Sequence, residues 1–390
     1  MNRPSPDAGW AITGAGTVCS VADSAPGLFD ALCAGRSGLA PLRGFDPALF
    51  GAQHAYEIDD PRRSAGPGLR DRPGRATELL CRAVAEAVDD AGLGQDLHGI
   101  PVLIGTGLRE LRSAELWRTD GARLEADGLY FGPAMRSRFN TTASYTFTNA
   151  CSASLYALGL GTDLLATGAV DTVVVAGVDV ITESMFGLLD RVHPAPVDSV
   201  RPFDRNRRGV LMGDGAAAIV LRAPAHDAAR TPRAWLRGIG LNCDAYHVTA
   251  PDPAGVAAAM DAAFTVAGVT PGDIDLVMAH GTGTLLNDEA EATALGKTFA
   301  ARASSPLVTA VKSMTGHTSG ASGLMSLVVA ASSLGTGLVP PTVGLHDPVP
   351  EAEGLDFVTG TARRADLRYA QVDAFGFGGV NAVAIVERAD

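Results

Sequence analysis

The chain has 390 residues, of which 46% are hydrophobic and 19% are charged, so it is a well-buried globular protein and not a disordered one. This length exceeds one ordinary hydrophobic core and predicts two closely packed halves. The net charge of −12 argues against bulk binding of nucleic acid, and an acidic partner would need a local basic patch.

The cysteines are five in number, scattered and without a CxxC pair: Cys19, Cys33, Cys81, Cys151 and Cys243. Such a set fits a reducing compartment and favours neither a disulfide framework nor a zinc site. The N-terminal sequence lacks the apolar core of a signal peptide, and no later stretch is an uninterrupted membrane span. We therefore expect a cytoplasmic protein that binds no membrane and no metal.

The first elements of the chain follow a strand, turn and helix pattern. WAITGAGTV at 10–18 predicts a short strand that runs into a Gly-rich turn. A turn of this kind can bind a phosphate, but GxG alone is a weak signal, and we interpret it as a tight turn. A helix is expected from Ser24 to Cys33, closed by Gly35. Five arginines between residues 62 and 75 then indicate a solvated loop or a docking patch.

A repeated pattern predicts two related halves. A helix ending at Ala91-Gly92 and a strand ending at Gly105 recur around Ala267-Gly268 and Gly281, at an offset of 176 residues (267 − 91). LLATGAV at 164–170 also resembles SLGTGLV at 333–339. Nearly all-apolar strands such as 172–180 indicate sheets that are covered on both faces. We predict a layered α/β/α/β/α body with a boundary near residues 224–235.

A candidate nucleophile lies in the stretch from Thr141 to Ala169. This stretch begins as an extended run rich in Thr, Tyr and Phe and changes at Asn149-Ala150-Cys151 into a Leu-rich helix. The free N–H groups and positive dipole end of a first helical turn are expected to favour a thiolate at Cys151. A lone cysteine is more often a buried structural residue, so this assignment depends on catalytic partners from later segments of the chain.

Three glycine-rich elements each follow a predicted strand: HGTGT from His280, KSMTGH from Lys312 to His317, and FGFGGVN from Phe375. Equivalent strand ends of a duplicated fold come together, so Cys151 of one half can meet His280 and His317 of the other. A single histidine is more often a satisfied core residue, but the three elements in this order point to one site.

These segments resemble elongating β-ketoacyl-acyl carrier protein synthases, the type I/II-like ketosynthases of the thiolase superfamily, over nearly the whole chain. The motifs that carry the resemblance are AITGAGTV, NACSAS, VRPFDRNRRGVLMGDGAA, AHGTGTLLNDEAEA, VKSMTGHTSGASG and DAFGFGGVN. The resemblance implies a thiolase-like five-layered α/β/α/β/α fold of two pseudo-twofold-related halves. Residues 1–230 would hold the nucleophilic cysteine, and residues 231–390 would hold the catalytic histidines.

The resemblance also implies partners and no cofactor. Substrates would arrive on the phosphopantetheine of an acyl carrier protein, and the chain would form a homodimer, or a heterodimer with a related ketosynthase-like subunit. The candidate docking residues for the acidic carrier protein are arginines, with ordinary solvated charges as the alternative: Arg62, Arg63, Arg70, Arg205, Arg207 and Arg208.

By the same resemblance, Cys151, His280 and His317 form a catalytic triad, and Lys312 orients the histidines. Cys151 would accept the acyl chain, and two neutral histidines would stabilise the enolate left when malonyl loses CO2. The N–H groups of Cys151 and Phe377 would form the oxyanion hole for the acyl step.

Further roles are implied by the same motifs. Thr282 and Thr284 would bind pantetheine. Asp288 and Glu291 would support the site, with Glu291 paired to Lys312, unless both are plain charges at a helix start. The mobile gate would consist of Phe375, Gly376, Phe377 and Gly378.

The chain departs from the family pattern at several positions. The segment between Gly107 and Cys151, which in the family shapes the acyl pocket and the dimer contact, is about ten residues short. The cation-site positions read Met278, Ser326 and Asp373-Ala374, so we predict no bound cation. Val210 stands where phenylalanine is common, which predicts a wider pantetheine channel. These departures favour a specialised synthase, for example of polyketide biosynthesis.

The leading functional hypothesis is a decarboxylative Claisen condensation of a Cys-bound acyl chain with malonyl-acyl carrier protein. One alternative is an acyl-Cys enzyme that transfers, hydrolyses or cyclises its acyl group without decarboxylation. Another is a non-catalytic chain-length partner, although such subunits typically lack the cysteine. A degradative thiolase is disfavoured because no cysteine follows Cys243.

Overall fold

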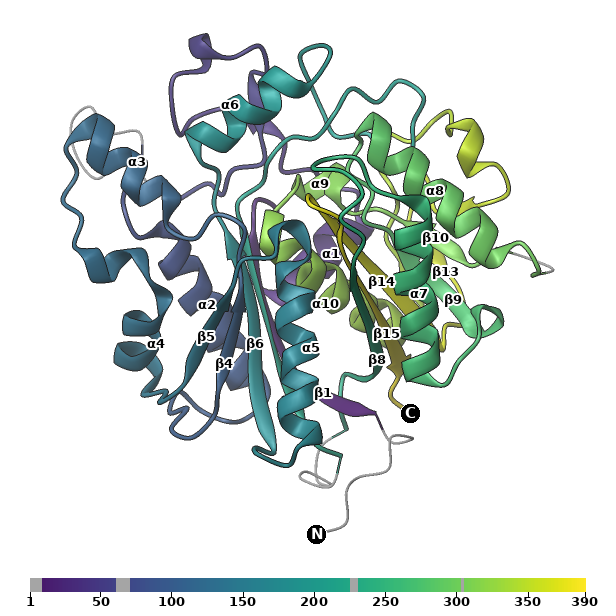
Figure 1. The fold of residues 1–390 in the computed structure, drawn as a ribbon, viewed down its shortest axis with the longest axis horizontal. Helices are drawn as coiled ribbons and strands as arrows, with labels where there is room; N and C mark the ends of the chain where they lie inside the picture. Colours follow the sequence, from purple (N-terminus) through teal and green to yellow (C-terminus); the bar gives the residue numbers. More distant parts are fainter. Residues whose placement is uncertain (1–8, 61–70, 225–230, 303–304) are drawn as a thin grey trace.

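The computed structural model describes residues 9–60, 71–224, 231–302 and 305–390 (Figure 1). The elements of the first half are β1 Trp10–Cys19, α1 Ala25–Cys33, β2 Ala40–Pro41, β3 His54–Ala55, α2 Arg75–Asp90, β4 Val102–Gly105, α3 Leu111–Asp120, α4 Phe131–Phe139, β5 Ser144–Phe147, α5 Ala153–Ala166, β6 Thr172–Asp179, α6 Glu183–Val192 and β7 Gly215–Arg222. Those of the second half are β8 Ala234–Cys243, α7 Pro253–Ala267, β9 Ile274–Met278, α8 Leu285–Phe299, β10 Leu307–Thr309, α9 Lys312–Thr315, α10 Ser322–Thr336, β11 Leu338–Val339, β12 Asp356–Phe357, β13 Arg363–Arg364, β14 Tyr369–Gly376 and β15 Val380–Arg388.

The main sheet repeats the same strand arrangement on both sides of a seam between β1 and β8, with β12 as an extra edge strand beyond β10. Its order is β12-β10-β9-β14-β15-β8-β1-β7-β6-β4-β5. From the seam outward, the strands of the first half follow the order β1-β7-β6-β4-β5, and those of the second follow the order β8-β15-β14-β9-β10. In each half the first two pairs of neighbouring strands are antiparallel and the next two pairs are parallel. The seam itself joins only three residue pairs, 10–12 with 234–236. The internal repeat that the sequence predicts is therefore present in the strand order.

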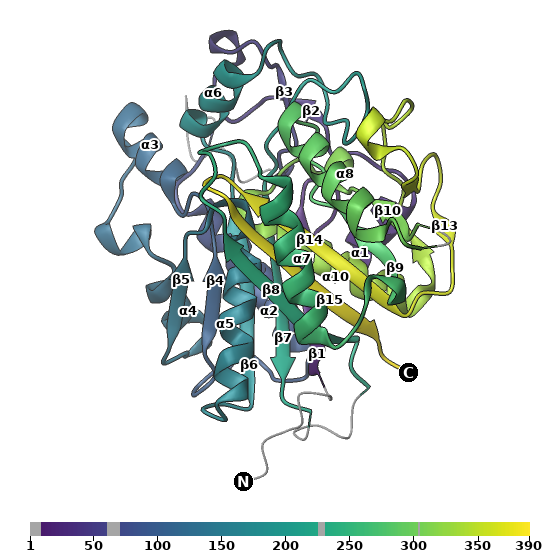
Figure 2. The ribbon, with the colours of Figure 1, turned by 45° about the vertical axis from the view of Figure 1, so that its right-hand side comes forward.

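The helices cover these two half-sheets in three layers, as Figures 1 and 2 show from two sides. α2 packs on the outer face of the first half-sheet, and α7 and α8 pack on that of the second. α1, α5 and α10 lie between the half-sheets in one large apolar core. The central strands β6 and β7 are buried at every position, because helices cover both of their faces. The predicted α/β/α/β/α architecture is confirmed.

The two helices that start at the site are related by the repeat. α5 and α10 begin 169 residues apart (322 − 153), and each follows a short 3-10 turn, at 150–152 and 319–321. Ala150 and Ser319 begin these turns with φ of 48° and 47°, a left-handed conformation that side chains other than glycine seldom adopt. The chain therefore makes the same sharp turn into a central helix in both halves.

The Gly-rich turn predicted near the N-terminus is wrong. Residues 10–19 form one continuous strand, and Gly14 and Gly16 lie inside it. A Cβ at Gly14 would lie 2.2 Å from the carbonyl oxygen of Ala87, and one at Gly16 would lie 2.2 Å from that of Ala83. These glycines therefore allow α2 to lie directly on β1, and they form neither a tight turn nor a phosphate cradle.

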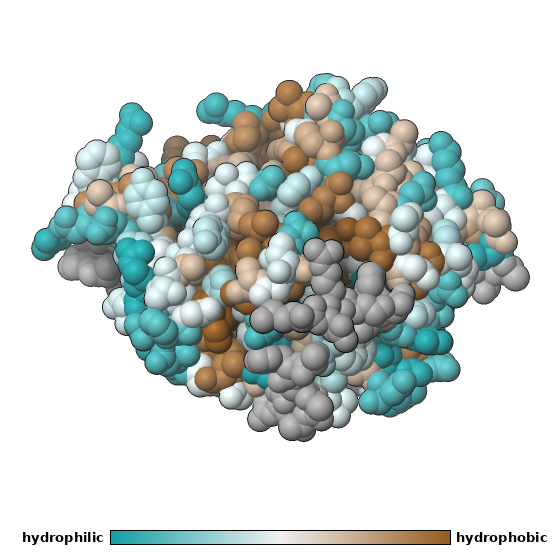
Figure 3. Space-filling view, turned by 60° about the horizontal axis from the view of Figure 1, so that its bottom comes forward, coloured by the Kyte–Doolittle hydropathy of each residue, from teal (hydrophilic) through white to brown (hydrophobic). Residues whose placement is uncertain are grey.

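No helix in the described part of the chain is long and apolar enough to cross a membrane. The face seen in Figure 3, the bottom of Figure 1, carries apolar residues in patches between hydrophilic ones.

The close approach of α2 to β1 predicts a strong effect of adding one methyl group. Gly16→Ala should lower the free energy of unfolding by about 3 kcal/mol, because the Cβ would collide with backbone atoms of α2 that cannot move aside. Gly335→Ala is the matched control, because Gly335 lies exposed in α10 with no atom within 4 Å of its added Cβ. Urea unfolding of the two variants tests this, and equal midpoints would contradict the packing argument.

Candidate active site

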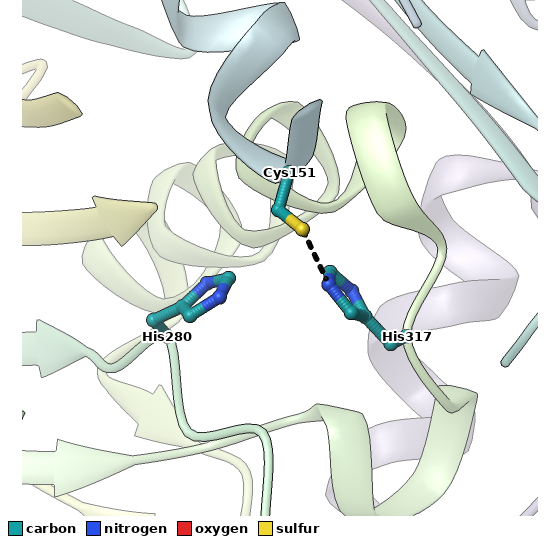
Figure 4. Close-up of side chains that lie close together, drawn as sticks. All are labelled: Cys151, His280 and His317. Atoms are coloured by element: carbon teal, nitrogen blue, oxygen red, sulfur yellow. Dashed lines mark hydrogen bonds between the residues drawn. The ribbon is translucent and has the colours of Figure 1, made fainter. Parts of the chain in front are cut away.

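Three side chains from three separate segments meet where the two halves join (Figure 4). Cys151 comes from the turn before α5, His280 follows β9, and His317 follows α9. The Sγ of Cys151 lies 3.0 Å from Nε2 of His317. The imidazole rings of His280 and His317 are 5.5 Å apart and nearly perpendicular. The sulfur and one nitrogen of each ring lie within 4.8 Å of one another, so the structure brings together the triad expected from the sequence.

The turn before α5 is held so that Cys151 faces the histidines. Ser152 donates its hydroxyl hydrogen toward the carbonyl oxygens of Asn149 and Val380, which ties the turn to the start of β15. A Cβ at Gly376 would lie 3.3 Å from the backbone nitrogen of Cys151, closer than most Cβ contacts. The bare backbone of Gly376 thus lets β14 approach the nucleophile closely.

The resting form of Cys151 differs from the expectation. Burial raises the pKa of the Cys151 thiol to about 11, so the thiolate is not favoured at neutral pH. The charge of Lys312 and the backbone N–H groups of Phe377 and Cys151 itself act in the opposite direction, but desolvation of the charged sulfur outweighs them. The sequence-based expectation of a thiolate at Cys151, which relied on the helix dipole, was wrong because it did not take the burial of the sulfur into account.

Both histidines are neutral. Burial lowers the pKa of His280 and of His317 well below the usual value, and the positive charge of Lys312 lowers both further. A neutral imidazole can accept the proton of a thiol and can also donate an N–H to an oxyanion. The pair therefore has the protonation state that the enolate role requires.

Lys312 contacts His280 and does not form the expected ion pair with Glu291. Its Nζ lies 3.3 Å from Nδ1 of His280 and donates to the carbonyl oxygen of the same residue. Glu291 instead accepts the backbone N–H groups of His280 at 2.6 Å and Gly281 at 2.8 Å. Burial lowers the pKa of Lys312 and raises that of Glu291, which fits two buried groups whose attraction acts over a longer distance.

Asp288 and Glu291 together fold the turn that carries His280. Asp288 accepts backbone N–H groups from Phe203 at 2.7 Å and from Thr282 and Gly283 at 3.2 Å. Both carboxyl groups are fully buried, so the alternative of plain charges at a helix start is wrong. The backbone N–H groups of this turn therefore bind carboxylates of α8, in place of the carbonyl oxygens that a regular helix or sheet would supply.

Thr282 and Thr284 lie at an open pocket with a cavity volume of about 130 Å³. Their hydroxyl oxygens are 2.9 Å apart, and that of Thr284 also accepts the N–H of Asn287 at the start of α8. The pocket runs past Cys151 and both histidines, and five of its wall residues are apolar side chains from the first half: Leu108, Met185, Leu189, Val210 and Met212. Sequence reasoning missed α6, which supplies two of them, because its residues match no motif.

Only part of the predicted gate lies in a loop. Phe375 and Gly376 belong to β14 and pair with Asn381 and Val380 of β15. The ring of Phe375 is buried and lies 5.7 Å from that of His280. Phe377, by contrast, is 44% exposed, and Gly378 adopts a φ of 86° in the tight turn that follows. The gate therefore stays a prediction, with Phe375 and Gly376 at the end of a strand and Phe377 and Gly378 in the turn that follows it.

The structure also corrects the predicted docking arginines. Arg62, Arg63 and Arg70 lie outside the described residues. Arg207 is buried and donates to the carbonyl oxygens of Thr284 and Leu285 and to Glu289, so it holds the start of α8 and cannot dock a partner.

The other predicted docking residues differ in their surroundings. Arg205 and Arg208 are exposed, and Arg205 pairs with Asp347 at 3.2 Å. Within the loop that was predicted to be solvated, Arg75 is buried against Asp71 and Asp214. Of the predicted docking residues within the described ranges, Arg208 is thus the one whose charge is both exposed and outside an ion pair with another described residue.

Comparison with known proteins gives consistent results along the whole chain. A family model described as Beta-ketoacyl synthase, N-terminal domain, matches residues 10–226, and one described as Beta-ketoacyl synthase, C-terminal domain, matches residues 233–346. The chain is 31% identical to a 3-oxoacyl-[acyl-carrier-protein] synthase 2 of Vibrio cholerae, over 97% of this chain and 98% of that one. It is 32% identical to the tetracenomycin polyketide synthase ketoacyl synthase alpha subunit of Streptomyces glaucescens, over 97% of this chain and 96% of that one. Among solved structures, the ishigamide ketosynthase/chain length factor is 32% identical with a TM-score of 0.87, over 98% of this chain and 100% of that one.

The pKa of about 11 predicts how Cys151 reacts with an alkylating reagent. We expect its alkylation by iodoacetamide to accelerate about tenfold per pH unit through pH 9 and 10, because only the thiolate reacts and its population keeps rising below the pKa. Peptide mass spectrometry after timed exposure measures this, and the exposed Cys243 in the same sample reports the reactivity of the reagent. A rate that levels off below pH 8 would show that the thiolate is already formed.

Proposed function

This chain belongs to the β-ketoacyl synthase family, and we propose that it joins an acyl chain held on Cys151 to malonyl-acyl carrier protein by a decarboxylative Claisen condensation, in fatty-acid or polyketide biosynthesis. The observation that supports this function most directly is one sulfur and two neutral imidazoles within 4.8 Å at an open pocket. The presence of all three side chains argues against a non-catalytic chain-length subunit.

The first step loads the acyl chain. His317 takes the thiol proton across the 3.0 Å contact while Sγ attacks the thioester carbonyl. The carbon–sulfur bond to the carrier breaks, and the departing pantetheine thiolate takes the proton back. The backbone N–H groups of Cys151 and Phe377, which face the sulfur, stabilise the oxyanion of the tetrahedral intermediate. Proton transfer at the moment of attack is needed because the resting sulfur is a thiol.

The second step makes the carbon nucleophile. The bond between the malonyl α-carbon and its carboxylate breaks, CO2 leaves, and the electron pair forms an enolate. The Nε2–H of His280, whose Nδ1 lies 3.3 Å from Nζ of Lys312, holds the enolate oxygen together with His317, which must first change to the tautomer protonated at Nε2. The charge of Lys312 helps to keep both rings neutral. The enolate carbon then attacks the acyl carbonyl carbon, the bond to Sγ breaks, and the Cys151 thiolate takes one proton from solvent, which the reaction consumes overall.

The pocket and the chain's partners complete the proposal. Thr282 and Thr284 bind the pantetheine arm, and the apolar wall with Met185 and Leu189 accepts the acyl chain. The reaction uses no cofactor, because the phosphopantetheine of the carrier protein holds the substrates. The second subunit is another copy of this chain or a related ketosynthase-like chain. The ishigamide relative, whose name includes both a ketosynthase and a chain length factor, supports a heterodimer.

Release of labelled CO2 tests the reaction. With acyl-Cys151 and malonyl-carrier protein labelled at the free carboxyl, we expect stoichiometric CO2, and His280→Ala should lower its rate about 100-fold or more by removing one donor to the enolate. Cys151→Ala should give no acyl adduct by intact mass. An acyl adduct that persists in Cys151→Ala would overturn the nucleophile. Acyl transfer without CO2 would instead support an acyltransferase.

Docking of the carrier protein is tested by charge. Arg208→Glu should weaken binding of an acidic acyl carrier protein several-fold at low salt, and raised salt should weaken binding by the parent chain, because opposite exposed charges are screened. Arg364→Glu on β13, an exposed arginine, is the control with the same change in net charge. Equal affinities of the two variants, measured by calorimetry, would exclude Arg208 from the contact.

A further inference from the structure

Asp179 is a buried acid beside the site for which neither the motifs nor the proposed reaction has a role. It is the last residue of β6, at the end of an apolar strand, and its side chain is fully buried. Its Oδ1 accepts the hydroxyl of Thr106 and the N–H of Leu108, both at 2.8 Å. Its Oδ2 accepts the N–H groups of Gly107 and Gly320, both at 2.7 Å.

These four donors come from both halves of the molecule. Thr106, Gly107 and Leu108 form the loop after β4, whereas Gly320 belongs to the turn before α10. Two carboxylate oxygens thus bind one loop from each side of the seam. An ionised carboxylate only accepts hydrogen bonds, so all four donors can bind it. A protonated carboxylic acid would instead have its own O–H hydrogen facing one of these donors. The four donors therefore favour the ionised form. Burial raises the pKa of Asp179, but the backbone N–H groups favour its charged form.

The loops held by Asp179 form part of the pocket. Gly107, Leu108 and Ser319 all line it. A Cβ at Gly107 would lie 2.4 Å from the hydroxyl oxygen of Ser319, so the two loops are in direct contact there. Ser319 has the left-handed φ of 47°, and its neighbour Gly320 is the residue bound to Asp179. The carboxylate therefore holds a strained turn against the first half at the pocket wall.

The charge of Asp179 also acts on the nucleophile. Two charged groups act on the Cys151 thiol: Lys312 of α9 lowers its pKa and Asp179 of β6 raises it, while both histidines are neutral. In a buried site that water does not screen, one negative charge strongly disfavours the formation of a second negative charge nearby. The effect of Asp179 therefore adds to that of desolvation.

We propose that Asp179 is a positioning residue that holds the Thr106–Leu108 loop of the first half against the Ser319–Gly320 turn of the second and thereby sets the shape of the pocket wall. The claim that Asp179 positions the pocket wall depends only on the observed contact between the two loops. The expected effect on acyl chains depends in addition on the proposed function.

Two variants remove hydrogen bonds of Asp179 to different extents. Asp179→Asn keeps the size of the side chain, but its NH2 group cannot accept the two hydrogen bonds that one carboxylate oxygen accepts, and the negative charge is lost as well. The freed loops and the lost charge should both change the alkylation of Cys151 by iodoacetamide at pH 8, and loss of the charge should make it faster because Asp179 raises the pKa of Cys151. Thr106→Val removes one donor to Asp179 and the acceptor of the Arg109 N–H but keeps the charge, so the pH dependence of its alkylation should match that of the parent chain.

A second readout reports on the pocket wall. The parent chain and Thr106→Val are given an equimolar mixture of butanoyl and dodecanoyl N-acetylcysteamine thioesters, and acyl-Cys151 is counted by intact mass. Loss of the Thr106 hydroxyl, which donates to Asp179 and accepts the N–H of Arg109, should change the ratio of the two adducts about fivefold, whereas a loss of folded protein alone would leave the ratio unchanged.

The outcomes are distinct. An unchanged alkylation profile in folded Asp179→Asn, or an unchanged adduct ratio in Thr106→Val, would overturn the proposal. If Asp179→Asn does not fold, as judged by circular dichroism, the adduct ratio of Thr106→Val decides. If the parent chain accepts neither thioester, the proposed function fails, and the alkylation profiles still decide the role of Asp179.

Discussion

The contact between the sulfur of Cys151 and Nε2 of His317 joins the two halves of the molecule, and the rest of the site depends on its being buried. Removal of water keeps the thiol protonated and both imidazoles neutral, because a charged form of any of them would lose its solvation. These three side chains are thus expected to become charged only during the reaction, when a proton moves across the contact. The open pocket beside it supplies the route by which a thioester can reach the sulfur.

Buried acids give the site its shape. Asp288 and Glu291 bind the backbone N–H groups of the turn that carries His280, and Asp179 binds those of two loops from opposite halves. Each carboxylate is paired mainly with backbone donors, which offset part of its desolvation cost and fix turns that no regular ladder could hold. The glycines of these turns are needed for the same reason, since Gly281 and Gly283 have positive φ.

Several sequence-based interpretations were wrong for a common reason. Gly14 and Gly16 suggested a turn but permit a helix to lie on a strand, and Arg207 suggested docking but holds the start of α8. The expected pairing of Glu291 with Lys312 is replaced by bonds to backbone, and the dipole argument for Cys151 was outweighed by burial. In each case the residue type was identified correctly, but its role was decided by tertiary packing that the local sequence pattern does not record.

The sequence by itself determined the repeat, the layered architecture and the three motif residues that meet, because apolar periodicity and glycine-rich strand ends are local properties that a chain records in order. Only the tertiary structure decided which atoms face one another: that His317 and not His280 contacts the sulfur, that Lys312 lies on His280, and that Asp179 binds both halves. It also decided the protonation of the site, since burial is set by how all layers pack and not by any one segment.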